Sequence, residues 1–311
     1  MKNRQPVGIA VAVFLMAGAL LVAGHLVGPC HKKPDLQQLS GSDLMTQYEQ
    51  IADPTARHMF VLRQVAARNM PASTLSFVPI KVTGQKGTEV EFQVSPHPLR
   101  IGTDQDWIEV PLDGPHALAA AELVGCTLPT AWMAMQTDLM AKKTRGMVHF
   151  FDALEITNLM KIDWNPEKPD GALLRSPELF ERRSELLRAW LTENKFEDQW
   201  LIGGYYKDII QPSATGAANR LWSYGGYDDQ GNLIQPVGWM HTSNYFDYVT
   251  LPRFVKPWLK VNGQIVSISD FTDNAAYAIE FKFDQNIISA PAYELSPELE
   301  EFVRKNKKNT P

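Results

Sequence analysis

The spacing of apolar positions predicts helices near both ends of the chain and in its middle. Residues 34–70 carry apolar side chains at helical intervals, and Asp53 followed by Pro54 is typical of a helix start. Residues 176–195 repeat this arrangement, with Ser176 as the N-cap. Further helices are predicted at 115–124, at 130–142 and from 298 toward the C-terminus.

Runs of β-branched and aromatic residues, separated by turns that contain glycine, predict the strands. Residues 258–268 predict a hairpin because Asn262-Gly263 suits a type I′ turn, and residues 220–241 predict another. Single strands are predicted at 73–82, 88–94, 106–112 and 199–211. Helices and strands come in blocks, so the predicted fold class is α+β, a mixed or antiparallel sheet with packed helices behind an N-terminal membrane segment.

The first thirty residues predict export. Lys2 and Arg4 precede an uncharged apolar run over residues 7–29. A charged start followed by an apolar run is typical of a signal peptide, and a run of this length also suffices for a helix to span a bilayer. The chain is therefore expected at the periplasmic or extracellular face, either cleaved or held in the membrane through residues 7–29. Cys30 suggests a lipoprotein, although Pro29 occupies the position where lipidation favours a small residue.

The domain organisation follows from these patterns. The predicted parts are a signal peptide or membrane anchor (1–30), a helical stalk (31–72), a main α+β domain (73–290) and a tail that is helical and then disordered (291–311).

Composition narrows the classes of partner. Hydrophobic residues make up 44% of the 311 residues and charged residues 21%, which is ordinary for a globular protein. The formal net charge of −5, with no basic stripe among the aromatics, argues against a nucleic-acid partner. The sequence contains no HExxH and no paired CxxC, so neither a metal site nor a cofactor is predicted. His58, His97 and His116 show no partners at useful spacing.

Cys126 admits two interpretations. If a helix begins near Thr127, the thiol lies at its N-terminus, where the helix dipole lowers a thiol pKa and favours a nucleophilic thiolate. The alternative is a small buried residue that fills the turn between two helices.

His241 is the best candidate partner for a nucleophilic Cys126. It follows a predicted hairpin, and Asn244 or Asp247 lies near enough in sequence to orient its ring. In that arrangement Cys126 attacks an amide carbonyl and His241 serves as the general base. The leading hypothesis is thus an exported, envelope-associated hydrolase of the cysteine amidase or peptidase type that acts on cell-wall peptide.

Two further groups of residues offer a binding surface. Lys207 and Asp208 place charges inside an otherwise apolar strand after Gly203-Gly204, which indicates a solvated edge strand or an ion pair beside a cleft. Aromatic residues on the 220–241 hairpin suit a glycan or a peptide; they are Trp222, Tyr224, Tyr227 and Trp239. The rival hypothesis is therefore a non-catalytic envelope protein that binds glycan or peptide, or a membrane-anchored accessory component of an assembly.

Three stretches resemble a family of uncharacterised secreted bacterial proteins. "GCTLPTAWM" is similar to the family's GC-x-LPT-x-x-M, "GGYYKDII" to AGHKKDVV, and "YGGYDDQGNLIQPVGWMHTSNYFDYVT" to YGWH…DG-x-IQP…VH-x-x-x-Y-x-DYSHG. The resemblance covers about residues 100–275 and implies a shared fold and export. The matching positions are Cys126, Lys207, Asp208, His241, Tyr245 and Asp247.

The chain departs from the family where the family has three histidines. Tyr205, Tyr227 and Thr250 stand at those positions. If the family uses several histidines for hydrolysis, the resemblance implies an altered or inactive member.

Overall fold

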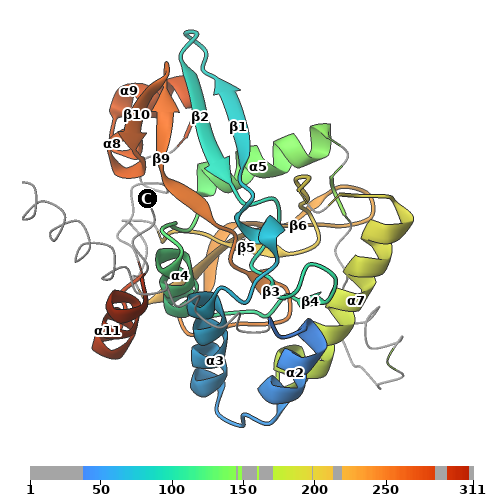
Figure 1. Cartoon of the computed structure of the whole chain (residues 1–311). Helices are drawn as coiled ribbons and strands as arrows, with labels where there is room; N and C mark the ends of the chain where they lie inside the picture. Colours follow the sequence, from blue (N-terminus) through green and yellow to red (C-terminus); the bar gives the residue numbers. More distant parts are fainter. Residues whose placement is uncertain are drawn as a thin grey trace, which may run out of the picture. The chain divides into compact units, whose positions relative to one another are not determined.

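The protein is an α+β structure whose two larger sheets pack against helices (Figure 1). The computed structural model describes residues 38–144, 146–148, 160, 171–197, 199–212, 219–283 and 293–307. Residues 1–37 lie outside this range, and with them the predicted signal peptide or anchor. Among the described residues, no helix has the length and apolar character needed to cross a membrane.

The first sheet has four antiparallel strands in the order β1-β2-β9-β10. They are β1 (Val78–Thr83), β2 (Glu89–Val94), β9 (Val255–Val261) and β10 (Gln264–Ser267). The predicted hairpin is confirmed, because Asn262 and Gly263 both have positive φ, 48° and 82°, as a type I′ turn requires. One face packs on Trp132 of α5 (Ala131–Lys143), whose indole meets Phe92 and Phe271. Helices α8 (Ile268–Thr272) and α9 (Ala275–Phe281) contribute to the same core.

The second sheet is mixed, with the order β7-β6-β5-β8. Its strands are β7 (Leu233–Thr242), β6 (Arg220–Tyr227), β5 (Lys207–Ile209) and β8 (Thr250–Leu251). The predicted hairpin of residues 220–241 is confirmed as β6–β7, while β5 pairs with β8 in parallel. Two short strands, β3 (Ile101–Gly102) and β4 (Trp107–Ile108), form a separate ladder. The predicted strands at 106–112 and 199–211 are thus much shorter than expected.

Side-chain caps fix the helix starts that the sequence predicts. Asp53 accepts a hydrogen bond from the backbone N–H of Ala56 (2.6 Å) at the start of α3 (Pro54–Ala67). Thr130 and Ser176 cap α5 and α7 (Pro177–Glu193) in the same way. In the part of the chain that the structure describes, the other helices are α2 (Gly41–Glu49), α4 (Gly114–Leu123), α11 (Pro297–Asn306) and the short 3₁₀ turns η2 (Ala72–Leu75) and η3 (Leu173–Arg175).

The prediction of a helical stalk over residues 31–72 is wrong for the part that the structure describes. Leu44 and Tyr48 of α2, and Val61 and Leu62 of α3, are fully buried in the largest hydrophobic core. Both helices belong to one compact unit with the rest of residues 38–311. An amphipathic pattern requires a buried face, and here the domain itself supplies the covering surface.

The C-terminal helix is confirmed, and it also joins the core. Leu299 and Val303 of α11 are buried in the same cluster, and α11 packs against α4. The main domain therefore extends beyond the predicted limits of residues 73 and 290 on both sides.

Candidate functional site

Cys126 is a core residue in the turn between two helices, as the second interpretation predicts, which contradicts its role as a nucleophile. It lies in the turn between α4 and α5, is 4% exposed, and its Sγ points to the carbonyl oxygen of Val124 at 3.7 Å. Helix α5 begins at Ala131, not near Thr127, so the thiol is not at a helix N-terminus. Burial raises the pKa of Cys126 to about 11, where the hypothesis required a lowered value.

Cys126 is expected to resist alkylation in the native protein. A buried thiol with a raised pKa offers almost no thiolate to a reagent at neutral pH. The rate of labelling by iodoacetamide, followed by mass spectrometry of the peptide that contains Cys126, should become measurable only in denaturant. Rapid labelling of the folded chain near pH 7 would restore the thiolate hypothesis.

His241 lies on β7 and is exposed, with its ring stacked on Tyr245 at 3.7 Å between centroids. Partial burial lowers the pKa of His241, and the charged groups that act on this pKa are Asp247 and Lys207. The charged groups that act on the pKa of Cys126 are different ones, Lys256 and Arg68. The structure thus does not bring His241 and Cys126 together.

The predicted orienting residues have other partners. Asp247 accepts hydrogen bonds from the hydroxyl groups of Tyr245 (3.2 Å) and Thr250. Asn244 accepts one from Thr242 (2.5 Å). These contacts shape the loop after β7, so the predicted Cys126–His241–Asp247 arrangement is not formed.

Asp208 lies in the interior, so the prediction of a solvated edge strand is wrong. Strand β5 runs between β6 and β8, and Asp208 pairs with the buried guanidinium of Arg253 (3.5 Å). Lys207, its neighbour in sequence, is half-buried. The predicted ion pair beside a cleft is replaced by a pair with a residue distant in sequence.

A second buried carboxylate, Asp138 of α5, lies close to Asp208. Burial and the negative charge of Asp208 raise the pKa of Asp138 to about 7, and burial raises that of Asp208 to about 6. Gly203 makes room for Asp138, because a Cβ there would lie 2.7 Å from the Asp138 Oδ1 atom. The hydroxyl of Tyr227 is hydrogen-bonded to Asp138 and to the hydroxyl of Tyr224 (2.9 Å). Asp138 and Asp208 thus form a buried acidic pair that contacts the half-buried Tyr227.

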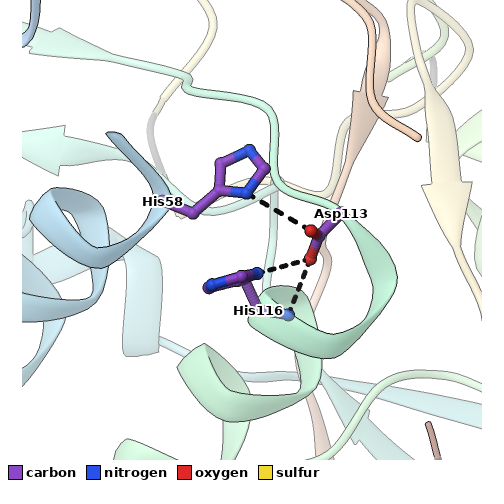
Figure 2. A group of neighbouring side chains, drawn as sticks. All are labelled: His58, Asp113 and His116. Atoms are coloured by element: carbon purple, nitrogen blue, oxygen red, sulfur yellow. Dashed lines mark hydrogen bonds and ion pairs between the residues drawn. The ribbon is translucent and has the colours of Figure 1, made fainter. Parts of the chain in front are cut away.

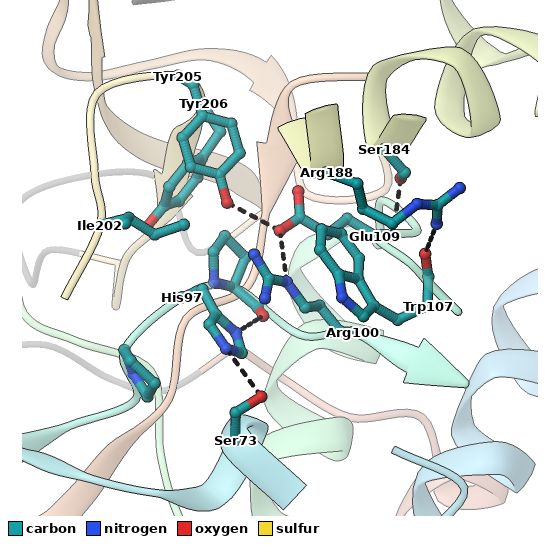
Figure 3. A network of polar contacts seen from close by, with 12 residues as sticks. Ser73, His97, Arg100, Trp107, Glu109, Ser184, Arg188, Ile202, Tyr205 and Tyr206 are labelled. Atoms are coloured by element: carbon teal, nitrogen blue, oxygen red, sulfur yellow. Dashed lines mark hydrogen bonds and ion pairs between the residues drawn. The ribbon is translucent and has the colours of Figure 1, made fainter. Parts of the chain in front are cut away.

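Glu109 forms the centre of a buried ionic network (Figure 3). Its carboxylate accepts from Arg100 Nε at 3.1 Å and from the Tyr205 hydroxyl at 2.8 Å, and it lies 3.3 Å from Arg183 Nη2. The side chains of Glu109, Arg100 and Arg183 are fully buried. His97, for which no partner was predicted, contacts Ser73 Oγ nearby at 3.2 Å. The network joins α7 to the segments before and after β3 and β4, and its burial gives it a structural role.

His58 and His116 also have a partner that the sequence did not predict. Both Nδ1 atoms face the carboxylate of Asp113, at 3.4 Å and 2.7 Å, and all three side chains are buried (Figure 2). Asp113 caps α4, and His58 reaches it from α3. Although burial acts in the opposite direction, the contacts with His116 and His58 hold the pKa of Asp113 below its usual range. Sequence separation concealed the contact of His58, whereas Asp113 and His116 lie only three residues apart at a helix start, a spacing that favours a capping contact.

The predicted aromatic surface divides into buried and exposed residues. Trp222 is buried, and Trp239 stacks on it from the solvent side at 4.4 Å between centroids. Tyr224 is also buried, and Tyr227 is half-buried. Trp239 and Tyr227 are therefore the members of the predicted set that solvent reaches.

Strand β7 presents an unusual edge. Within the described residues it pairs with β6 on one side and with no strand on the other. Its ten residues include no charged side chain. Four of the nine exposed large apolar side chains in the described part of the chain belong to it; they are Leu233, Ile234, Trp239 and Met240. Natural sheets usually protect an edge with charges, so an apolar edge of this length indicates a binding surface.

Comparisons with protein-family models, curated proteins and solved structures found no match to this chain. The resemblance to secreted bacterial proteins therefore stays a prediction.

Proposed function

We propose that the protein is an envelope binding protein that takes up an extended, uncharged peptide segment along the outer edge of β7. The single observation that carries the proposal is an uncharged edge strand with exposed apolar side chains on both of its faces. The charged start and apolar run of residues 1–30 support placing this function outside the cytoplasm.

The segment from Val237 to Thr242 is the favoured docking edge. Pro236 has no backbone N–H and interrupts hydrogen bonding before it, whereas no proline follows it within the strand. An added strand gains main-chain hydrogen bonds, and alternate side chains supply specificity. Trp239, whose ring stacks on the buried Trp222, offers an aromatic anchor on one face of β7. Met240, which is 79% exposed, lies on the opposite face of the strand.

A peptide fits this surface better than a glycan. Stacking on Trp239 alone would suit either ligand, but the edge also offers main-chain donors and acceptors, which only an extended polypeptide matches at strand spacing. The cysteine hydrolase hypothesis loses support, because Cys126 is buried and because Cys126 and His241 interact with different charged groups.

Selection from a phage-displayed library of random linear peptides tests the proposal. The full chain should enrich extended apolar peptides that bind the Met240→Lys or Trp239→Ala variant at least tenfold more weakly, a loss of about 1.4 kcal/mol or more. The lysine places a charge on the docking edge, and the alanine removes the anchor.

Ile265→Lys is the matched control. Ile265 is 71% exposed on β10, an edge strand of the other sheet, so its substitution should leave peptide binding unchanged. Failure to enrich any peptide, or equal binding to Met240→Lys, would contradict the proposal. If sedimentation instead shows a dimer that Met240→Lys dissociates, the occupant of the edge is a second copy of this chain, and the proposed peptide ligand is wrong.

A further inference from the structure

Three buried side chains from two helices converge on one point beneath the loop that follows β7. Figure 2 shows His58 of α3 and His116 of α4 directed at the carboxylate of Asp113. Each residue offers one ligating atom, and these three atoms lie within 4.8 Å of one another. Two imidazoles and one carboxylate are a common ligand set for zinc and related divalent ions.

Both histidines retain an unused ring nitrogen. The Nε2 atoms of His58 and His116 are buried and have no hydrogen-bond partner among the described residues. Buried polar atoms are nearly always satisfied in native proteins, so two such atoms mark this cluster as unusual. The Nδ1 atoms, which face Asp113, are the ring nitrogens placed to share an ion with its carboxylate.

We infer that His58, Asp113 and His116 bind one divalent transition-metal ion, with zinc as the best match to these ligands. Ligands on one four-coordinate zinc ion, at about 2.0–2.2 Å each, lie about 3.3–3.6 Å apart. The three atoms lie within 4.8 Å of one another, so the widest separation has to close by up to about 1.5 Å for all three to reach the ion.

Neighbouring segments pack closely around the three side chains. The rings of Phe246 and His58 pack edge to face at 4.5 Å between centroids, and Tyr293 lies against Gly114 in the first turn of α4. The backbone N–H of Gly114 also donates to the carbonyl oxygen of Ser243 (2.9 Å). An ion here would join α3, α4 and the loop after β7, and a water molecule would complete its coordination.

Metal content tests the inference on the full chain, purified without a histidine tag. Mass spectrometry after zinc supplementation and dialysis should find one zinc per chain, and Co²⁺ added after chelation should give the absorption of a four-coordinate site. Zinc should raise the melting temperature of the chelated protein. A wild-type chain that binds no zinc, or whose melting temperature does not respond to zinc, overturns the inference without any substitution.

Substitutions then locate the ion. His58→Gln, His116→Gln and Asp113→Asn should each weaken zinc binding at least tenfold. Asparagine remains a good N-cap, so Asp113→Asn removes the ligand charge while α4 keeps its start. His241→Gln is the control, because His241 is an exposed histidine elsewhere, and it should retain one zinc per chain. Loss of zinc only in His241→Gln would place the ion elsewhere and refute the assignment.

Discussion

Replacing Glu109 with glutamine is expected to lower the free energy of unfolding by about 3–5 kcal/mol, a large share of the ~5–15 kcal/mol typical of a domain. Glu109 pairs with both Arg100 and Arg183, and all three side chains are fully buried. Glutamine keeps the shape of the side chain and removes its charge. Two buried guanidinium groups then lose their shared counter-ion, and the desolvation cost of each is no longer offset.

Urea unfolding followed by tryptophan fluorescence measures this loss. Glu91→Gln is the matched control, because Glu91 pairs with Lys81 and Lys260 at the surface, where ion pairs contribute at most about 1 kcal/mol. A Glu109→Gln loss no larger than the Glu91→Gln loss would show that the buried network contributes little.

Replacing Asp138 with asparagine is expected to remove most of the pH dependence of stability above about pH 4. The pKa of Asp138 is about 7 in the folded protein and about 3.9 in an unfolded chain. Between these values the folded state holds a proton that the unfolded state has released. The contribution of Asp138 to stability therefore falls as pH rises and is lost above about pH 7. Three pKa units correspond to about 4 kcal/mol at most. Asp208, with a pKa raised to about 6, acts in the same direction and remains in the variant.

Unfolding in urea at about pH 5 and about pH 8 tests this prediction. Asp138→Asn should be more stable than wild type by about 2–4 kcal/mol at the higher pH and by much less at the lower. The exposed Asp229→Asn variant should follow the wild-type curve at both. Parallel curves for Asp138→Asn and wild type would mean that Asp138 is ionised in the folded state across this range.

Local signals in the sequence predicted the elements well. The caps Asp53, Thr130 and Ser176 and the Asn262-Gly263 turn act over a few residues, so their physics is contained in a short stretch of sequence. The helix start at Ala131 also explains the error at Cys126. Thr130 provides the cap, and the preceding residues form the turn in which the thiol is buried.

Contacts between distant segments could not be predicted in this way. His58 and Asp113 meet because α3 packs against α4, and no spacing rule records that contact. Asp208 becomes an interior residue because β8 and β6 flank it, and its partner Arg253 lies far along the chain. The apolar pattern of α2 and α3 likewise indicated a buried face without indicating which surface covers it.

The same limit applies to the proposed binding edge. The sequence identified the aromatic residues of the 220–241 hairpin, but the burial of Trp222 and the exposure of Trp239 depend on which face of β6–β7 meets the core. The edge position of β7 follows from the strand order. Its lack of charge was visible in the sequence and became informative only once that position was known.

Hydrogen exchange of the β7 amides distinguishes peptide docking at this edge from docking elsewhere. The full chain would be compared with and without a peptide selected from the phage library, and exchange would be followed by mass spectrometry of fragments that cover residues 237–242. Exchange in this segment should slow on binding, because an added strand takes hydrogen bonds from the outer edge. Protection confined to other elements, with β7 unchanged, would contradict the claim that this edge is the binding site.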